Sequence, residues 1–259
     1  MALNKSNLER IAPSSFKDGK FKNNWKELLN SFAFGELSEG DMLLFSDGVS
    51  NISLFQNLLV EPRPIIIKQT TLNKIRVKHD IEFSQLKNLA EWFENTPLIL
   101  ESLNYKNSFV VFANTTDKLG NEIIVALHLN TEVGQKNFEI TLDEIATVYG
   151  KENVDYFVEN VFNLNKTIIL NEKTRDWLLR TGVSFPQPLA NLVELNITHP
   201  TKVCQENILQ IKQQLNEHEA AQEVNEEPFD PDLEEAEAVA ASDALAHGAS
   251  GVGLDEPTI

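Results

Sequence analysis

Residues 62–80 constrain the fold of this chain most strongly, because their pattern predicts a short strand that passes directly into a basic helix. Three consecutive isoleucines follow Pro64 at positions 65–67, and a β-branched run of this length is typical of a buried strand. Thr70 or Thr71 then offers a side-chain oxygen that can cap the first N–H groups of a helix. We therefore expect a strand followed at once by a helix.

This segment is basic in an otherwise acidic chain. The protein has 259 residues and a formal net charge of −17. Between Glu61 and Asp80, however, there is no acidic residue and there are five basic ones: Arg63, Lys68, Lys74, Arg76 and Lys78. A local cationic patch of this kind is compatible with nucleic-acid binding even in an acidic protein, because binding responds to local charge.

The periodicity of the basic helix separates its candidate functional residues. At about 100° per residue, Thr71, Lys74 and Lys78 fall on one side, and His79 falls on the neighbouring apolar side. The lysine side is either a solvated helix face or a surface for a phosphate backbone. His79 is either a residue at the rim of the core or a proton-transfer group, for which imidazole is suited near neutral pH.

Charge and composition divide the chain into four parts. After Lys212 there is no Lys or Arg, and residues 213–259 hold 13 acidic residues. Residues 1–212 carry a net charge of only −4 (22 basic against 26 acidic residues), which argues against a broad DNA-coating protein. We expect an N-terminal lead (1–17), an α+β domain (18–195), an amphipathic helix (196–218) and a disordered acidic tail (219–259).

The sequence shows no pattern typical of a disulfide-rich, metal-binding or membrane protein. Cys204 is the only cysteine and the five histidines are scattered, so we expect neither a disulfide framework nor a metal site, and no cofactor. The N-terminus has no apolar leader, and no run approaches 18 apolar residues. We therefore expect a soluble protein of a reducing compartment, without a membrane partner.

The pattern of apolar residues and turns predicts an α+β fold with a small antiparallel sheet flanked by helices. Turn-like composition separates the central runs, which favours an antiparallel meander. The predicted strands are 41–45, 65–67, 98–102, 108–113, 122–129 and 166–170. The predicted helices are 18–34, 52–59, 84–94, 141–148, 154–161 and 172–180.

Two of the helical predictions rest on specific signals. Thr141 and Glu144 have the spacing of a capping box, which predicts a helix over 141–148 that ends at Tyr149 and Gly150. In the segment 196–218, Cys204, Ile208, Ile211 and Leu215 form a thin apolar stripe. This stripe could dock on the body of the protein or pair with a partner helix.

The order of these segments resembles the phage MuF C-terminal domain family over roughly residues 20–190. The most specific pieces are the Thr/Lys/His helix within residues 64–79 and the run Ile-Ala-Thr-Val-Tyr-Gly at 145–150. Further segments that carry the resemblance are 25–29, 86–89, 97–100, 107–111, 117–129 and 171–182. The family is similar to predicted phage nucleases of the barnase, EndoU, colicin and RelE types.

The resemblance implies an α+β fold and a metal-independent ribonuclease that acts on host RNA in the host cytoplasm, or is carried in the virion. His79 would be the general base or acid, Lys74 and Lys78 phosphate ligands, and Thr71 and Ser108 hydroxyl donors. Tyr149 would stack a base or donate a proton. The remaining candidate substrate-binding residues are Lys68, Thr70 and Arg76. Ser108 and Tyr149 come from the resemblance, and each could instead be structural, as a residue at the start of a strand and a packed aromatic.

A second hypothesis is that the chain is a catalytically silent phage protein. It would bind a host or virion protein through its C-terminal helix and acidic tail, since charged segments often fold on a partner. The sequence does not indicate an oligomeric state.

Overall fold

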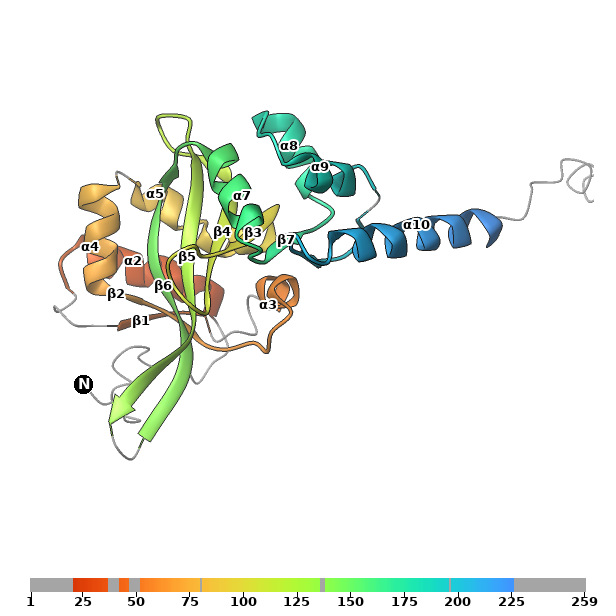
Figure 1. Ribbon diagram of the computed structural model, residues 1–259. Coiled ribbons are helices and arrows are strands. Elements are labelled where there is room, and N and C mark those ends of the chain that lie inside the picture. The colour runs from red at the N-terminus through yellow and green to blue at the C-terminus, as the bar shows by residue number, and fades with distance from the viewer. Residues whose placement is uncertain are drawn as a thin grey trace, which may run out of the picture. The chain divides into compact units, whose positions relative to one another are not determined.

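A computed structural model describes residues 21–36, 42–46, 52–79, 81–135, 138–195 and 197–225 (Figure 1). By its internal contacts the chain divides into two units, residues 1–216 and 217–259. The predicted N-terminal lead and most of the predicted tail lie outside the described residues, but 219–225 belong to a helix. Among the described residues, no helix is both long and apolar enough to cross a membrane.

The first unit is built on one eight-stranded sheet with the strand order β1-β2-β6-β5-β4-β3-β7-β8. Among the described strands, β2 and β6 are parallel and the other neighbours are antiparallel. The strands are β1 (Met42–Ser46), β2 (Ile65–Lys68), β3 (Leu98–Glu101), β4 (Ser108–Thr116), β5 (Glu122–Gln135), β6 (Phe138–Lys151), β7 (Ile168–Leu170) and β8 (Thr201–Val203). The α+β class and the β3–β4–β5 meander are confirmed, but the sheet is larger than predicted.

Helices pack on both faces of this sheet. They are α2 (Phe21–Ala33), α3 (Ile52–Leu58), α4 (Gln69–Lys78), α5 (Phe83–Leu86), α6 (Leu89–Glu94), α7 (Val154–Asn163), α8 (Thr174–Thr181), α9 (Gln187–Val193) and α10 (Ile208–Asn225). Side chains from α2 to α6 form one core with the first face, and side chains from α7 to α10 form a second core with the other. The alternation along β5 explains this division: Ile123 and Val125 lie in the first core and Ile124 in the second.

The predicted helix over 141–148 is wrong, because these residues belong to strand β6. The strand pairs with β5 along its length, and Asp143, Glu144 and Ile145 also pair with β2. Thr141 and Glu144 have capping-box spacing, but the segment is rich in β-branched residues and pairs with two strands, of which β2 lies far away in the sequence. Tyr149 and Gly150 are therefore strand residues and do not terminate a helix.

Some helix ends also differ from the prediction. The N-cap of α4 is Lys68, without a side-chain cap, and Thr70 and Thr71 lie inside the first turn. The predicted helix 84–94 divides into α5 and α6, and the N-cap of α5 is Glu82. Helix α8 ends at Gly182, which adopts a left-handed conformation (φ 69°) that glycine tolerates.

The C-terminal part of the first unit contains more structure than one helix. Helix α9 and strand β8 precede α10, which begins at Ile208 rather than near residue 196. Ile208 is buried in the second core, and Ile211 and Leu215 pack against it. The predicted apolar stripe therefore docks on the body, whereas Cys204 lies before the helix.

Candidate functional site

Helix α4 lies along the edge of β6 that β2 leaves open (Figure 1). Strand β2 pairs with β6 only at residues 143–145, and α4 follows β2 directly and contacts β6. The register of the parallel pair thus fixes where the helix starts. Leu72 and Ile75 anchor α4 in the first core, whereas Lys74 and Lys78 are exposed.

This arrangement brings His79 against Tyr149. His79 is the C-cap of α4, and its backbone N–H donates to the Ile75 carbonyl at 3.2 Å. Its ring centroid lies 5.4 Å from that of Tyr149 on β6, with an interplanar angle of 33°. Two predicted catalytic residues from distant parts of the sequence therefore meet. We call His79, Tyr149, Lys74 and Lys78 the α4–β6 corner.

The environment of the corner favours a neutral imidazole and a protonated phenol. Burial lowers the pKa of His79 below its ordinary value of 6.5, and the positive charges of Lys74 and Lys78 lower it further. Its Nε2 atom is buried and has no hydrogen-bond partner among the described residues. Burial raises the pKa of Tyr149 above its ordinary value of 10.0. A neutral imidazole can accept a proton, and a phenol that keeps its proton can donate a hydrogen bond.

Thr147 is a residue of the corner that the sequence did not indicate. It lies two residues from Tyr149 on β6, and their partners across β5, Ala126 and Ile124, are likewise two residues apart. Thr147 and Tyr149 therefore share a face of the sheet. The Thr147 hydroxyl oxygen is buried without a hydrogen-bond partner among the described residues. A bulge interrupts the register beside it, between Ala126 and Leu127, and bulges often re-aim side chains near functional sites.

The structure separates Ser108 from this corner. Ser108 is 3% exposed, starts β4, and donates to the Lys106 carbonyl at 3.1 Å. It pairs with His128 on β5, whereas Tyr149 pairs with Ile124. The two positions are thus four residues apart along β5, about 13 Å. Ser108 is therefore placed beside His128 rather than beside His79.

The remaining predicted site residues differ in their exposure and in their contacts. Thr71 is buried, so its hydroxyl does not share the exposed face of Lys74, whereas Thr70 and Arg76 are exposed. The Arg76 guanidinium lies 5.7 Å from the ring centroid of Phe32. Lys68 forms an ion pair with the buried carboxylate of Glu144. The sequence pattern predicts Glu144 to be helical, but this residue lies in strand β6.

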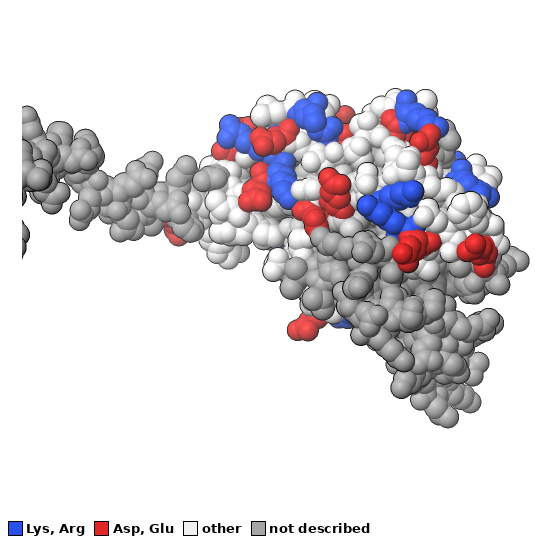
Figure 2. Space-filling view, turned by 180° about the vertical axis from the view of Figure 1, so that it is seen from behind, with Lys and Arg blue, Asp and Glu red and all other residues white. Residues whose placement is uncertain are grey.

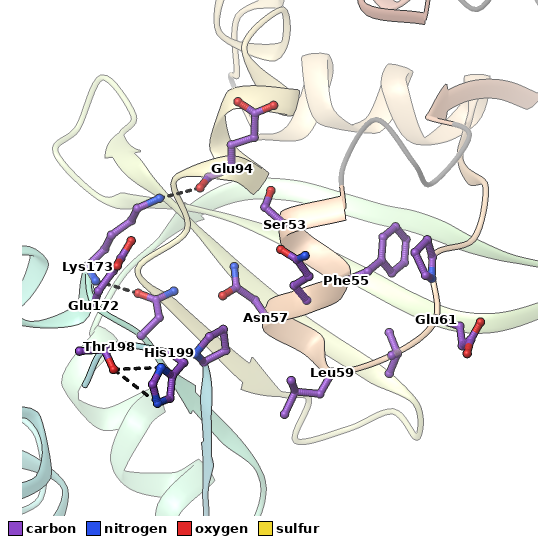
Figure 3. A pocket seen from close by; sticks show the side chains of 15 residues that line it. Ser53, Phe55, Asn57, Leu59, Glu61, Glu94, Glu172, Lys173, Thr198 and His199 are labelled. Carbon is purple, nitrogen blue, oxygen red and sulfur yellow. Dashed lines mark hydrogen bonds between the residues drawn. The ribbon is translucent and has the colours of Figure 1, made fainter. Parts of the chain in front are cut away.

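A pocket of about 830 Å³ lies elsewhere, around α3 (Figure 3). It is lined by residues of α3 and the following segment, by Asn171–Lys173 and by Thr198–Pro200. The Lys173 ammonium donates to the Glu94 carbonyl at 2.7 Å and to Asn95 Oδ1 at 3.3 Å. The residues lining this pocket include none of the predicted site residues.

The charged side chains do not form one broad basic surface on the face seen from behind. Over its described residues, Lys and Arg are interspersed with Asp and Glu (Figure 2). A polyanion on this face would meet separate cations rather than a continuous patch. Within the described ranges, no group of three or more His, Cys, Asp or Glu side chains is arranged to hold a metal ion.

Comparison with known families identifies this part of the chain. Residues 70–176 match the sequence model of the phage MuF-C-terminal domain, a range that contains α4 apart from Gln69, the strands β3 to β7 and only the first three residues of α8. Comparisons with curated proteins and with solved structures found no match. Residues 70–176 of this chain are therefore similar in sequence to the phage MuF-C-terminal domain family.

Proposed function

We propose that this chain is a metal-independent endoribonuclease of a phage or mobile element that acts on RNA in the host cytoplasm. The observation that supports it best is the α4–β6 corner. There an imidazole, whose buried Nε2 has no hydrogen-bond partner among the described residues, lies against a phenol at the end of a helix that carries two exposed lysines. The similarity of the family to predicted nucleases agrees with this proposal.

The reaction needs few catalytic groups from the enzyme, because the nucleophile belongs to the substrate. The ribose 2′-oxygen attacks the adjacent phosphorus, the bond to the 5′-oxygen breaks, and a 2′,3′-cyclic phosphate and a 5′-hydroxyl result. One enzyme group must accept the 2′-OH proton, another must donate a proton to the leaving oxygen, and cations must stabilise the phosphorane.

In the proposed mechanism, His79 accepts the 2′-OH proton, because its lowered pKa keeps it neutral at physiological pH. Tyr149 donates a proton or hydrogen bond toward the leaving oxygen. Lys74 and Lys78 neutralise the phosphate, and the unpartnered Thr147 hydroxyl donates to a phosphoryl oxygen in the role that the sequence assigned to Thr71 and Ser108.

The experiment that tests this proposal is incubation of total bacterial RNA and tRNA with the full-length protein in EDTA. We expect cleavage by the wild type and a loss of at least about a hundredfold for His79→Ala, the usual size of a general-base contribution. The midpoint of thermal unfolding should stay within a few degrees of wild type, because His79 is only partly buried at a helix end.

His199→Ala is the matched control, since His199 is exposed and lies in the α3 pocket. It should cleave RNA like the wild type. Intact RNA with the wild type would reject the nuclease proposal. Partial activity with a large loss of stability in His79→Ala would instead assign His79 to the core.

The alternative proposal is a catalytically silent protein that binds a host or virion protein. The stripe residues Ile208, Ile211 and Leu215 of α10 already pack on the second core, whereas Leu209 is exposed. This alternative therefore depends on the acidic residues beyond them, and no structural contact favours it over the nuclease.

A further inference from the structure

Polar side chains line up across the three central strands at a distance from the α4–β6 corner. Ser108 on β4 pairs with His128 on β5, and His128 pairs with Glu144 on β6. Paired residues of antiparallel strands point to the same face of a sheet. The Leu129 N–H donates to the Asn107 carbonyl at 2.7 Å, so the next pair, Ser108 and His128, is of the non-hydrogen-bonded type, with Cα atoms only about 4.5 Å apart.

The ammonium group of Lys68 lies at one end of this row, next to Glu144. The Lys68 ammonium lies 2.8 Å from a Glu144 carboxylate oxygen. The Glu144 side chain is 9% exposed, whereas that of Lys68 is 44% exposed. The carboxylate therefore holds the lysine in place, while the lysine still presents N–H donors to solvent.

An exposed aromatic ring packs on His128, in the middle of this row. The ring centroid of Tyr105 lies 5.5 Å from that of His128, with an interplanar angle of 42°, and Tyr105 is 63% exposed. Its loop is fixed by two serines. The Ser102 hydroxyl accepts from the backbone N–H groups of Asn104 and Tyr105, both at 3.3 Å, and Ser108 donates to the Lys106 carbonyl.

An exposed aromatic ring together with a nearby cation is suited to binding a nucleotide. A rigidly held, solvent-exposed aromatic ring offers a platform on which a base can stack, and a nearby cation can bind the phosphate of the same strand. An exposed tyrosine alone needs no explanation. Here, however, the ring rests on an imidazole in the same strand-paired row as the Lys68–Glu144 ion pair.

We propose that Tyr105, His128 and Lys68 form a binding subsite for a nucleotide of single-stranded RNA. This inference rests on the proposed ribonuclease function. Because the row is four residues along β5 from the position opposite Tyr149, about 13 Å, the subsite holds a nucleotide beyond the reacting one. The base stacks on Tyr105 and His128, Lys68 donates to a phosphate oxygen, and Glu144 positions Lys68.

The test separates binding from cleavage. Binding of a fluorescent 2′-O-methyl RNA oligonucleotide, which cannot be cleaved by 2′-OH attack, is measured with the full-length protein. We expect Tyr105→Ala and Lys68→Gln each to weaken binding by about tenfold, the size of one lost stacking or phosphate contact. Tyr156→Ala is the control for the ring, since Tyr156 is an exposed tyrosine on α7. Lys166→Gln is the control for the lysine, since Lys166 pairs with Glu101 on β3.

Cleavage of two substrates places the subsite relative to the corner. With a long RNA, Tyr105→Ala should raise KM about tenfold. With a dinucleotide, which covers only the reacting phosphate, the variant should match the wild type. Equal binding of the oligonucleotide by wild type, Tyr105→Ala and Lys68→Gln would overturn the subsite.

The two proposals fail in different ways. If the wild type cleaves RNA but neither variant changes oligonucleotide binding, the subsite is wrong and the nuclease stands. If Tyr105→Ala weakens binding but the wild type leaves RNA intact, the subsite stands and the nuclease is wrong. If the wild type neither binds nor cleaves, both are wrong.

Discussion

At the scale of single residues, buried polar atoms without partners are the most informative feature of the α4–β6 corner. Leaving a buried donor or acceptor unpaired costs about 1–3 kcal/mol. His79 Nε2 and the Thr147 hydroxyl are buried atoms without a hydrogen-bond partner in the described part of the chain. Arg63 Nη1 and Asp143 Oδ2 also lack hydrogen bonds, but they belong to an ion pair whose charged atoms are 3.9 Å apart. For the two groups near Tyr149, the described part of the chain offers no such ion pair.

Thr147→Val tests whether the hydroxyl serves the substrate. Valine has the shape of threonine without the oxygen, so the variant removes an unsatisfied buried group. We expect the free energy of unfolding to rise by about 1 kcal/mol and RNA cleavage to fall by at least about tenfold, since a donor to the phosphorane is lost. Denaturant unfolding and an RNA cleavage assay measure the two effects.

Thr147→Ser is the control, because it keeps the hydroxyl and should retain most of the activity. A purely structural role for the hydroxyl predicts the opposite pattern for Thr147→Val, a loss of stability with cleavage unchanged. That pattern would remove Thr147 from the site.

At the scale of secondary structure, the β5–β6 hairpin shows what the sequence could and could not predict. Local alternation and turn residues were sufficient for β3 and for the first parts of β4 and β5, which continue to Thr116 and Gln135. The helical spacing of Thr141 and Glu144 concealed β6, whose identity depends on pairing with β5 and β2. The meeting of His79 and Tyr149 was beyond local patterns for the same reason, because it follows from the parallel register of β2 and β6.

The turn that joins β4 to β5 packs closely against Gly150 of β6. The Asp117 carboxylate accepts hydrogen bonds from the backbone N–H groups of Leu119 and Asn121 and from the Asn121 side chain. A Cβ atom on Gly150 would overlap this carboxylate. We expect Gly150→Ala to lower the free energy of unfolding by about 1–3 kcal/mol, the usual cost of forcing extra volume into a packed site, as measured by chemical denaturation.

A double-variant cycle checks the cause of that loss. Asp117→Ala removes the overlapping group and the turn hydrogen bonds together, so adding Gly150→Ala to it should cost much less than in the wild type. Additive losses would show that Asp117 is not what excludes a side chain at Gly150.

At the scale of the whole molecule, the strongly acidic charge and the predicted site belong to different parts of the chain. Residues 226–259 hold ten acidic residues and no basic one. The body ends later than the sequence suggested, because Val203 of β8 and Ile208 of α10 are buried in the second core. Removing residues 200–259 would therefore damage the core, and a truncation that tests the acidic segment must begin after α10.

A chain that ends at Asn225 keeps every described element and lacks those ten acidic residues. We expect its thermal unfolding midpoint to match the full-length protein, and its RNA cleavage to be equal or higher at low salt, because an anionic segment competes with RNA for Lys74, Lys78 and Lys68. Any gain should vanish as salt screens the competition. Under the alternative proposal this truncation instead abolishes capture of a host or virion protein, and neither form of the chain cleaves RNA. Cleavage and pulldown assays with the two chain lengths at two salt concentrations therefore separate a tail that shields a nuclease from a tail that is itself the binding element.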